Sequence, residues 1–350
     1  MLATNEKRLK TQGGWIGRGA RRFEDERLVT GAGRYVDDIL PEGCLHLAIL
    51  RSPFARGPIR ALDVKAARAA PDVVAVLTGA DVAGLGVAAV NPLISGIAIP
   101  PFPLLAENEV EAVGQAVAAV IAETAVAAQD ALQLISLDID PQAPRAGVQE
   151  DEAMTRRWRA GDIDKAFAGA AHVARVSLQH ARVAPSPMEP RAALADWNGE
   201  TGELAMFLST QTPHRAKHDL TRILGLAPDK VRVVAPDVGG AFGGKSSLYP
   251  EEALIAFAAR HLKRPVKWCA TRGDDLQAAT HGRGGAADAE LALDADGRIL
   301  GLRARLNYPL GHWLPYSAAV PGRNASRVLP GPYAVDAVDI NFSGRLTNTA

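Results

Sequence analysis

A glycine-rich segment over residues 231–247, VRVVAPDVGGAFGGKSS, holds the residues whose types and spacing most directly indicate chemistry. It satisfies the G-x-x-x-x-G-K-[ST] pattern of a phosphate-binding P-loop through Gly239, Gly244, Lys245 and Ser246. In a P-loop the helix begins directly at the lysine, so that backbone N–H groups and the ammonium meet the phosphates together. Here the better helix start is Pro250, and no convincing apolar run ending in a magnesium-binding aspartate follows it. A P-loop nucleotidase is therefore an alternative function and not the preferred one.

The same glycines support a second interpretation, a loop whose backbone approaches a bulky ligand. Gly240 and Gly243 stand on either side of Ala241 and Phe242, and their freedom allows several N–H groups to point into one concavity. Such a loop suits an oxyanion or a metal-bound oxo group. Gln211 lies between a predicted strand and a predicted helix, where its neutral amide is able to donate to the same ligand. Taken alone, the segment is most simply a glycine-rich turn.

Histidine and cysteine give little sign of a metal or nucleophile site. His214 and His218 have the i, i+4 spacing of a zinc motif, but the glutamate of H-E-x-x-H is absent, so we expect two exposed side chains. Cys44 and Cys269 are far apart and form no CxxC pair, so this chain alone builds neither a disulfide framework nor an iron–sulfur or zinc site. We expect Cys269 to pack as a small hydrophobic side chain.

The composition indicates an ordinary globular α/β protein. The 39 lysines and arginines equal the 39 aspartates and glutamates, which leaves no electrostatic footprint for nucleic acid or an anionic membrane. The polar N-terminus lacks the apolar stretch of a signal peptide, and no apolar run is long enough for a membrane span, so we expect a cytoplasmic protein. Aromatic residues are few, and we expect Trp313 and Tyr316 to serve in packing.

The elements that position these residues fall into two regions. In the first, we predict strands over 35–39, 45–50 and 73–77, a short helix over 65–70 and a proline-broken loop over 84–103. A buried strand over 116–122, a helix over 125–134 with Thr124 as N-cap, and a strand over 135–139 are typical of a βαβ or split-βαβ unit. Prolines and a charged run then predict a linker.

In the second region strands and helices alternate again. We predict strands over 173–179, 192–197, 204–209 and 231–235, helices over 213–224 and 250–262, and a hairpin formed by 287–293 and 299–306. Proline in the first turn of each helix, and Gly225 after the first of them, mark the helix ends. The hairpin turn carries the expected Asp-Gly pair.

Several motifs occur in an order that resembles a known family. They are GRGARRFEDERLVTGAGRYVDDI, VGQAVAAVIAETAVAAQDAL, PSPMEPRAALADW, STQTPH, KVRVVAPDVGGAFGGK and YPEEALIAFAARHLKRPVKW. Together they resemble the N-terminal half of the molybdopterin-binding large subunits of the xanthine dehydrogenase, aldehyde oxidase and carbon monoxide dehydrogenase family. The resemblance spans residues 15–350.

The resemblance implies an α+β fold with an N-terminal α/β hammerhead-like domain, followed by the first part of a molybdopterin-cofactor-binding α+β domain. We therefore expect a polar arm over residues 1–20, the hammerhead-like domain over 21–145, a linker over 146–165 and the incomplete cofactor domain over 166–350.

The resemblance also implies roles for individual residues. The family holds molybdenum through a pterin dithiolene, so no protein side chain is expected to bind the metal directly. The expected cofactor contacts are Gln211, Gly240, Ala241, Phe242 and Gly243, and the expected substrate contacts are Phe242 and Ser246. Purine-oxidising relatives place a glutamate at the position of Ser246, so the serine favours an aldehyde or an N-heterocycle as the substrate.

The implied function is oxidative hydroxylation with water by a subunit of a multisubunit complex. The cofactor is molybdopterin, in its simple or its cytosine dinucleotide form, and electrons pass to partner subunits that carry 2Fe-2S clusters and FAD. The general-base glutamate of the family is expected beyond residue 350, so we expect the chain to be inactive without a companion C-terminal half or subunit. A different alternative is a non-catalytic structural or assembly half that binds its companion but no pterin.

Overall fold

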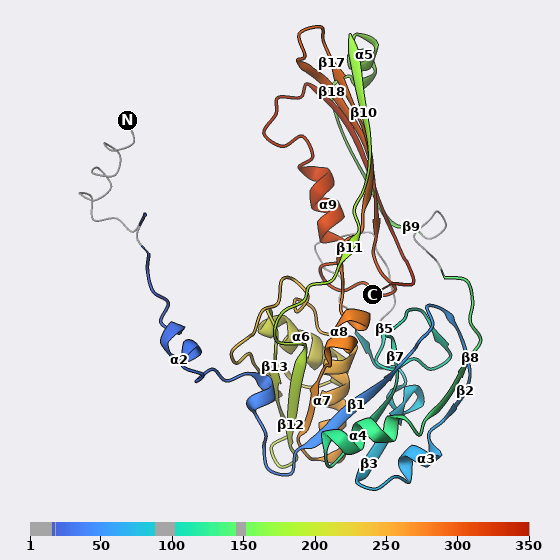
Figure 1. The fold of residues 1–350 in the computed structure, drawn as a ribbon, viewed down its shortest axis with the longest axis vertical. Helices are drawn as coiled ribbons and strands as arrows, with labels where there is room; N and C mark the ends of the chain where they lie inside the picture. The colour runs from blue at the N-terminus through green and yellow to red at the C-terminus, as the bar shows by residue number, and fades with distance from the viewer. Residues whose placement is uncertain (1–15, 18, 88–101, 145–151, 350) are drawn as a thin grey trace. The chain divides into compact units, whose positions relative to one another are not determined.

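The computed structural model describes residues 16–17, 19–87, 102–144 and 152–349, which divide between two compact units, residues 1–34 and 35–350 (Figure 1). The first unit contains the short helix α2 (Asp25–Val29), which ends where the Thr30 hydroxyl donates to the Glu26 carbonyl at 2.7 Å. The first unit thus extends to residue 34, beyond the polar arm predicted over residues 1–20.

A mixed sheet joins the two regions predicted from the sequence. Its strand order is β14-β13-β12-β15-β1-β7-β3. The strands are β1 (Leu45–Arg51), β3 (Val73–Thr78), β7 (Ala116–Ala122), β12 (Ala192–Asn198), β13 (Glu203–Leu208), β14 (Val231–Val234) and β15 (Val266–Cys269). Parallel pairing of β1 with β15 connects the N-terminal strands to those of the second region. Strands from the two regions predicted from the sequence therefore share one sheet.

Helices cover both faces of this sheet. Strand β7 is buried along its whole length, as its continuous apolar run AVAAVIA requires. Val120 and Ala122 on one face pack against α4 (Ala125–Leu132), and Ala119 and Ile121 on the other belong to the main core. That core includes much of α7 (Pro250–Leu262) and the apolar stripe of α6 (Pro213–Leu224).

A second sheet has the order β10-β17-β18-β19-β9 (Figure 1). It consists of β9 (Glu152–Ala160), β10 (His172–Gln179), β17 (Ala286–Leu293), β18 (Ile299–Pro309) and β19 (Ala337–Arg345), and α5 (Ile163–Ala168) and α9 (Val320–Arg327) pack on it. The predicted hairpin is confirmed as β17–β18. In its turn the Asp294 carboxylate accepts from the backbone N–H groups of Asp296 and Arg298 at 3.0 and 2.8 Å.

The linker predicted over residues 146–165 is wrong over residues 152–165, which form β9 and the start of α5. In β9, Met154 and Trp158 pack into the core of the second sheet, while Arg157 binds the Asp339 carboxylate with two hydrogen bonds of 2.8 and 2.6 Å. The charged run is therefore the polar face of an amphipathic strand.

Three further predictions about the first region are wrong. Residues 35–39 are not a strand, because the Asp38 carboxylate accepts from the Tyr35 N–H at 2.8 Å and closes a 3₁₀ turn, η1 (Val36–Asp38). The predicted loop over 84–103 contains paired strands, β4 (Gly86–Val87) and β5 (Phe102–Pro103), and its residues 88–101 lie outside the described residues. The predicted βαβ or split-βαβ unit does not form, because its two strands lie in different sheets: β7 belongs to the first sheet, whereas β8 (Ser136–Ile139) pairs with β2 (Gly57–Asp63) in a separate sheet.

The remaining elements are short. They are α3 (Lys65–Arg68), η2 (Gly79–Val82), β6 (Glu109–Val110), β11 (Arg182–Val183), η3 (Pro228–Lys230), α8 (Arg272–Ala278) and β16 (Gly282–Arg283). No helix in the described part of the chain has the length and apolar character that crossing a membrane requires.

Candidate functional site

Two loops leave the same edge of the first sheet and meet there. Strands β13 and β14 are parallel neighbours, and each is followed by a loop and then a helix, α6 or α7. The Gln211 N–H and the Thr210 hydroxyl donate to the carbonyl of Lys245, at 2.9 and 3.2 Å. The Thr212 hydroxyl donates to the carbonyl of Ser246 at 3.0 Å. These bonds fasten the glycine-rich loop to the start of α6.

The backbone of the glycine-rich loop turns sharply at three positions. Its φ angle is +98° at Gly240, +49° at Phe242 and +89° at Gly243. A left-handed conformation is unfavourable for a residue with a side chain such as Phe242, so the surrounding contacts must hold it there. The Phe242 side chain is 79% exposed. The Phe242 ring is thus exposed although its backbone is strained.

The structure brings Gln211 and Gly243 into direct contact. The Gly243 N–H donates to Oε1 of Gln211 at 3.0 Å, in an exposed position. Because Oε1 accepts this bond, the side-chain amide is oriented and its Nε2 carries the donor hydrogens. The amide can therefore present an N–H group to a ligand that lies in front of the loop.

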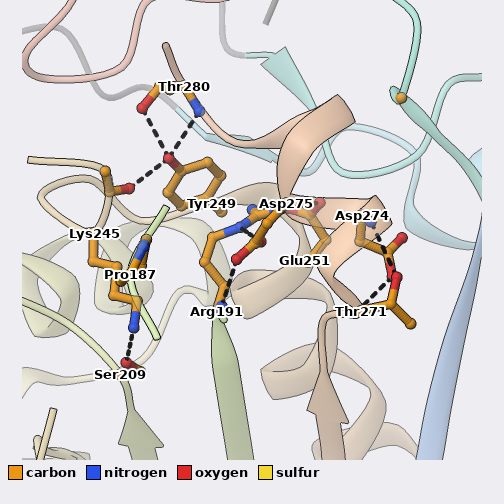
Figure 2. A network of polar contacts seen from close by, with 12 residues as sticks. Pro187, Arg191, Ser209, Lys245, Tyr249, Glu251, Thr271, Asp274, Asp275 and Thr280 are labelled. Carbon is orange, nitrogen blue, oxygen red and sulfur yellow. Dashed lines mark hydrogen bonds and ion pairs between the residues drawn. The ribbon is translucent and has the colours of Figure 1, made fainter. Parts of the chain in front are cut away.

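Lys245 does not have the environment of a P-loop lysine. It is 2% exposed, and its Nζ donates to the Glu189 carbonyl at 2.8 Å. The same Nζ donates to the Ser209 hydroxyl at 2.6 Å (Figure 2). Its third contact is an ion pair of 3.1 Å with Oε2 of Glu189. An ammonium group has three donors, so these contacts use all of them. Helix α7 begins at Pro250, as the sequence predicted, and the P-loop alternative is wrong.

Glu189 connects the PMEPR segment to the same loop. Its Oε2 accepts from the Gly239 N–H at 2.8 Å and from the Ser209 hydroxyl at 2.6 Å. The contact requires glycine, because a Cβ atom on Gly239 would lie 2.5 Å from the Glu189 Cβ. Within the described part of the chain, Oε1 of Glu189 is a buried oxygen with no hydrogen-bond partner.

A buried cluster of charges lies behind the loop (Figure 2). Nε of Arg191 pairs with Asp275 at 2.8 Å, and Nη1 of Arg51, on β1, pairs with Glu251 at 2.9 Å. The Arg191 guanidinium lies over the Tyr249 ring, 4.1 Å from its centroid. The Tyr249 hydroxyl donates to the Gly244 carbonyl at 2.6 Å. Buried polar contacts thus link the glycine-rich loop to β1.

Two neighbouring glutamates of α7 have opposite pKa shifts. Burial raises the pKa of Glu251, but attraction to Arg191 and Arg51 outweighs burial and holds it at about 2. Burial raises the pKa of Glu252 to about 8, with the hydrogen bond from the Tyr249 N–H only partly opposing it. Glu251 is therefore ionised at neutral pH, whereas Glu252 is mainly protonated.

A cavity of about 350 Å³ opens in front of the loop. Phe242 and Gly243 line it, as do the adjacent Gly244 and the ring of Trp313. The other predicted site residues are not part of its lining in the described structure: Gln211, Gly240, Ala241 and Ser246. The structure therefore separates the predicted residues into two that face the cavity and four that lie beside it.

Ser246 stabilises the loop instead of facing the cavity. Its hydroxyl donates to the Gly243 carbonyl at 2.8 Å and lies 3.4 Å from the Ser317 hydroxyl. The packing role predicted for the two aromatic residues is confirmed in part. Trp313 is buried with its ring centroid 5.4 Å from that of Tyr249, but it also lines the cavity. Tyr316 packs under the Arg215 guanidinium, 3.2 Å from its ring centroid.

Histidine and cysteine form no metal site in the described residues, where no group of three or more potential metal-binding side chains occurs. His214 and His218 are exposed, as predicted. Burial raises the pKa of the Cys44 thiol to about 11 and also raises that of Cys269, so both thiols are protonated at neutral pH. Neither cysteine has the lowered pKa of a nucleophile.

The wall of the cavity contains residues that the sequence analysis missed. Arg182 of β11 and Arg283 of β16 pair in an antiparallel ribbon, and His281 precedes β16. These residues come from segments about a hundred positions apart in the sequence. No local pattern marks them, because a two-residue strand has no recognisable periodicity.

Comparison with known proteins identifies the family. Residues 30–143 match the a/b hammerhead domain of aldehyde oxidase and xanthine dehydrogenase, and residues 147–350 match the molybdopterin cofactor-binding domain. The chain therefore belongs to the xanthine dehydrogenase and aldehyde oxidase family of molybdopterin-binding proteins. The predicted family, and the α+β fold with its hammerhead-like and cofactor-binding domains, are confirmed.

Individual relatives are large subunits of oxidoreductases. The chain is 37% identical to the nicotine 6-hydroxylase large subunit of Paenarthrobacter nicotinovorans, over 95% of this chain and 43% of that protein. It is 32% identical to the carbon monoxide dehydrogenase large chain of Hydrogenophaga pseudoflava, over 93% and 44%. The quinoline 2-oxidoreductase of Pseudomonas putida 86 has a similar structure, with a TM-score of 0.92, 34% identity and coverage of 96% and 45%. The chain thus spans less than half the length of these relatives.

Proposed function

We propose that this chain is part of a molybdenum hydroxylase that oxidises an aldehyde or an N-heterocycle. The reaction converts R–H and water into R–OH, two protons and two electrons. A bound molybdopterin supplies the redox chemistry of the metal. The observation that carries the proposal is the 3.0 Å hydrogen bond from the Gly243 N–H to the Gln211 side chain, beside the exposed Phe242.

The residues of the loop fit a bulky, oxygen-bearing group. We assign the Nε2 donor of Gln211 and the backbone over residues 240–243 to the cofactor. We propose that this cofactor is held by hydrogen bonds and not by side-chain metal ligands. The Phe242 ring forms one wall of the cavity in which the substrate would be held.

This chain's residues contribute orientation and binding in the proposed reaction. Gln211, locked by Gly243, offers a pre-oriented N–H donor, and such donors stabilise developing negative charge without reorganisation. Ser246 stands at the position where purine-oxidising relatives have a glutamate, and its side chain acts within the loop. Its hydrogen bond to Gly243 supports the same loop geometry. Because Ser246 does not line the cavity in the described structure, the proposal of an aldehyde or an N-heterocycle other than a purine rests on the absence of that glutamate and not on a contact made by the serine.

The general base and the electron acceptors are assigned to other parts of the complete enzyme. Because the chain spans less than half the length of its relatives, we propose that a companion C-terminal half or subunit supplies the glutamate base. Electrons would then pass to 2Fe-2S and FAD partner subunits in the cytoplasm. We propose molybdopterin in its simple or its cytosine dinucleotide form.

Elemental analysis tests this proposal and its alternative, a non-catalytic assembly half. The complex is purified from the native host through a tag on this chain, and molybdenum is measured together with iron. We expect both metals, and we expect Gln211→Ala to lower molybdenum content or activity by about 10- to 100-fold. The control is Gln133→Ala, an exposed position at the end of α4. A well-folded complex without molybdenum would establish the assembly role instead.

A further inference from the structure

One buried side chain, that of Tyr249, contacts three separate segments of the cavity wall. Its hydroxyl lies 2.6 Å from the Gly244 carbonyl and 2.9 Å from the Thr280 hydroxyl (Figure 2). Its ring centroid lies 5.4 Å from that of Trp313, in an edge-on arrangement. Gly244, Thr280 and Trp313 all line the cavity, and Tyr249 is not part of that lining in the described structure. The three segments follow β14, α8 and β18, so the tertiary fold brings them together.

The hydrogen-bonding capacity of the Tyr249 hydroxyl is used within the chain. A phenolic hydroxyl has one hydrogen, and here it is donated to the Gly244 carbonyl. The oxygen accepts from the Thr280 N–H at 3.2 Å and from the Thr280 hydroxyl at 2.9 Å. Tyr249 is 1% exposed, and burial raises its pKa, so the hydroxyl remains a donor at neutral pH. It has no hydrogen left for a ligand and acts only through the residues that it contacts.

The contact with Gly244 controls the turn that presents Phe242. The Gly244 N–H donates to the Ala241 carbonyl at 2.9 Å and closes the turn, while the Gly244 carbonyl accepts from Tyr249. A Cβ atom on Gly244 would lie 2.8 Å from the Pro185 Cγ, so this part of the loop fits closely against the neighbouring segment. A displacement of Gly244 therefore also displaces the Phe242 ring, which lines the cavity.

Tyr249 is itself held in place by buried groups. The Arg191 guanidinium lies 4.1 Å from the centroid of its ring and pairs with Asp275 at 2.8 Å. Asp275 belongs to α8, the helix that leads directly to Thr280. The Tyr249 N–H also donates to the Glu252 carboxylate of α7 at 3.0 Å. The ring and the segment around Thr280 thus share one buried support, and the hydroxyl connects that support to the glycine-rich loop.

We propose that Tyr249 is a positioning residue that fixes the separation between the glycine-rich loop and the segment around Thr280. The inference rests on the proposed function, because the cavity that these two segments line is where we place the substrate. A substrate that contacts both segments is held well only when their separation matches its size. If the hydroxyl is removed, the segments move independently, so a small ring is held less well and a larger ring is admitted.

Hydrogen exchange of backbone amides in the native complex, measured by mass spectrometry, tests the inference directly. Tyr249→Phe removes only the hydroxyl and keeps the ring that packs in this buried site. The Gly244 N–H retains its own partner, the Ala241 carbonyl, so faster exchange there reports movement of the loop. We expect an increase of about 10-fold, the effect of losing roughly one hydrogen bond from the closed state. Ile121→Val, in the buried strand β7, is the control for a general loss of stability.

Variants of Thr280 distinguish positioning from a merely structural role. Thr280→Val removes the hydroxyl that contacts Tyr249, and we expect it to increase the exchange of Gly244 by about 3-fold. Thr280→Ser retains a hydroxyl and should restore the wild-type rate. In a Tyr249→Phe background, Thr280→Val should add nothing, because the two groups act as one pair. Unchanged exchange at Gly244 in Tyr249→Phe, or an equal increase in Ile121→Val, would overturn the inference.

Steady-state kinetics of the native complex connect the contact with specificity. The probe substrates are benzaldehyde and 2-naphthaldehyde, which carry one and two aromatic rings. We expect Tyr249→Phe to lower the ratio of their kcat/KM values by about 5-fold against benzaldehyde, through KM more than through kcat. An unchanged ratio would contradict the effect on substrate size. Oxidation of neither aldehyde by the wild type would count against an aldehyde in the proposed function, while the exchange of Gly244 still decides the role of Tyr249.

Discussion

The Lys245 ammonium and the Glu189 carboxylate form a buried ion pair of 3.1 Å. The lysine comes from the glycine-rich loop and the glutamate from the PMEPR segment, so the pair joins two segments 56 positions apart. Ser209, directly after β13, accepts from the lysine and donates to the glutamate. The three residues thus hold together the loops that carry Gln211 and Phe242. The lysine of a motif that resembles a phosphate-binding loop therefore forms a buried structural ion pair in this protein.

Replacing Lys245 with methionine is expected to destabilise the chain strongly. The substitution leaves the Glu189 carboxylate buried without its counter-ion, which costs about 3–5 kcal/mol. Chemical denaturation of the purified chain measures the loss. Lys65→Met, at an exposed position of α3, is the control and should change the stability by no more than about 0.5 kcal/mol. Adding Glu189→Gln to Lys245→Met should recover part of the loss, and equal stability of wild type and Lys245→Met would contradict the role of the pair.

The raised pKa of Glu252 leads us to expect an unusual dependence of folding stability on pH. Its pKa is about 8 in the folded chain against an ordinary value of 4.5, so the folded state binds more protons than the unfolded state between these values. Stability from this group is therefore fully present below pH 4.5 and falls as the pH rises towards 8, by at most about 1.4 kcal/mol per pH unit.

Glu252→Gln should remove this loss, because a neutral amide retains an acceptor for the Tyr249 N–H. Urea unfolding midpoints at pH 5 and pH 8 give the comparison, with the exposed Glu109→Gln as control. The wild type should be less stable at pH 8 relative to pH 5 than the Glu252→Gln variant is. A parallel pH profile in the two proteins would show that Glu252 is ionised when buried.

Much of the fold was predictable where local signals mark the ends of elements. Helices α6 and α7 match their predicted bounds, because each has proline in its first turn, and Gly225 closes α6 in the left-handed conformation. Strand β9 was missed for a physical reason. The Asp339 partner of Arg157 lies 182 positions away, so the arginines look like a solvated linker until the sheet is formed.

The candidate site was predictable only in part for a similar reason. The contact of Gln211 with Gly243 follows from two parallel neighbouring strands, whose following loops must meet at one edge. The cavity wall formed by Arg182 and Arg283 depends on a ribbon between distant two-residue strands. No periodicity or spacing in the sequence encodes such a pairing, and the tertiary fold decides it.

Two glycines of the loop are expected to differ in their sensitivity to alanine. At Gly243 an added Cβ meets nothing within 4 Å, so only its φ of +89° is unfavourable and the cost is about 1–2 kcal/mol. At Gly239 the Cβ would lie 2.5 Å from the Glu189 Cβ, so the PMEPR segment must shift. We therefore expect Gly239→Ala to lower the denaturation midpoint more than Gly243→Ala does. The reverse order would mean that the loop is held by its backbone conformation and not by the contact with Glu189.

Substitutions of Phe242 should change substrate binding while leaving the stability of the chain almost unchanged. Its ring is 79% exposed, so Phe242→Ala removes little buried area and should change the unfolding free energy by no more than about 0.5 kcal/mol. Phe242→Gly should be slightly more stable than Phe242→Ala, because glycine relieves the left-handed backbone with φ of +49°. In the native complex both variants should raise the KM for an aromatic substrate, since the ring is a wall of the cavity. Steady-state kinetics and denaturation of the same preparations test both parts. If both variants lose stability but keep the wild-type KM, the ring packs against a companion segment and does not bind the substrate.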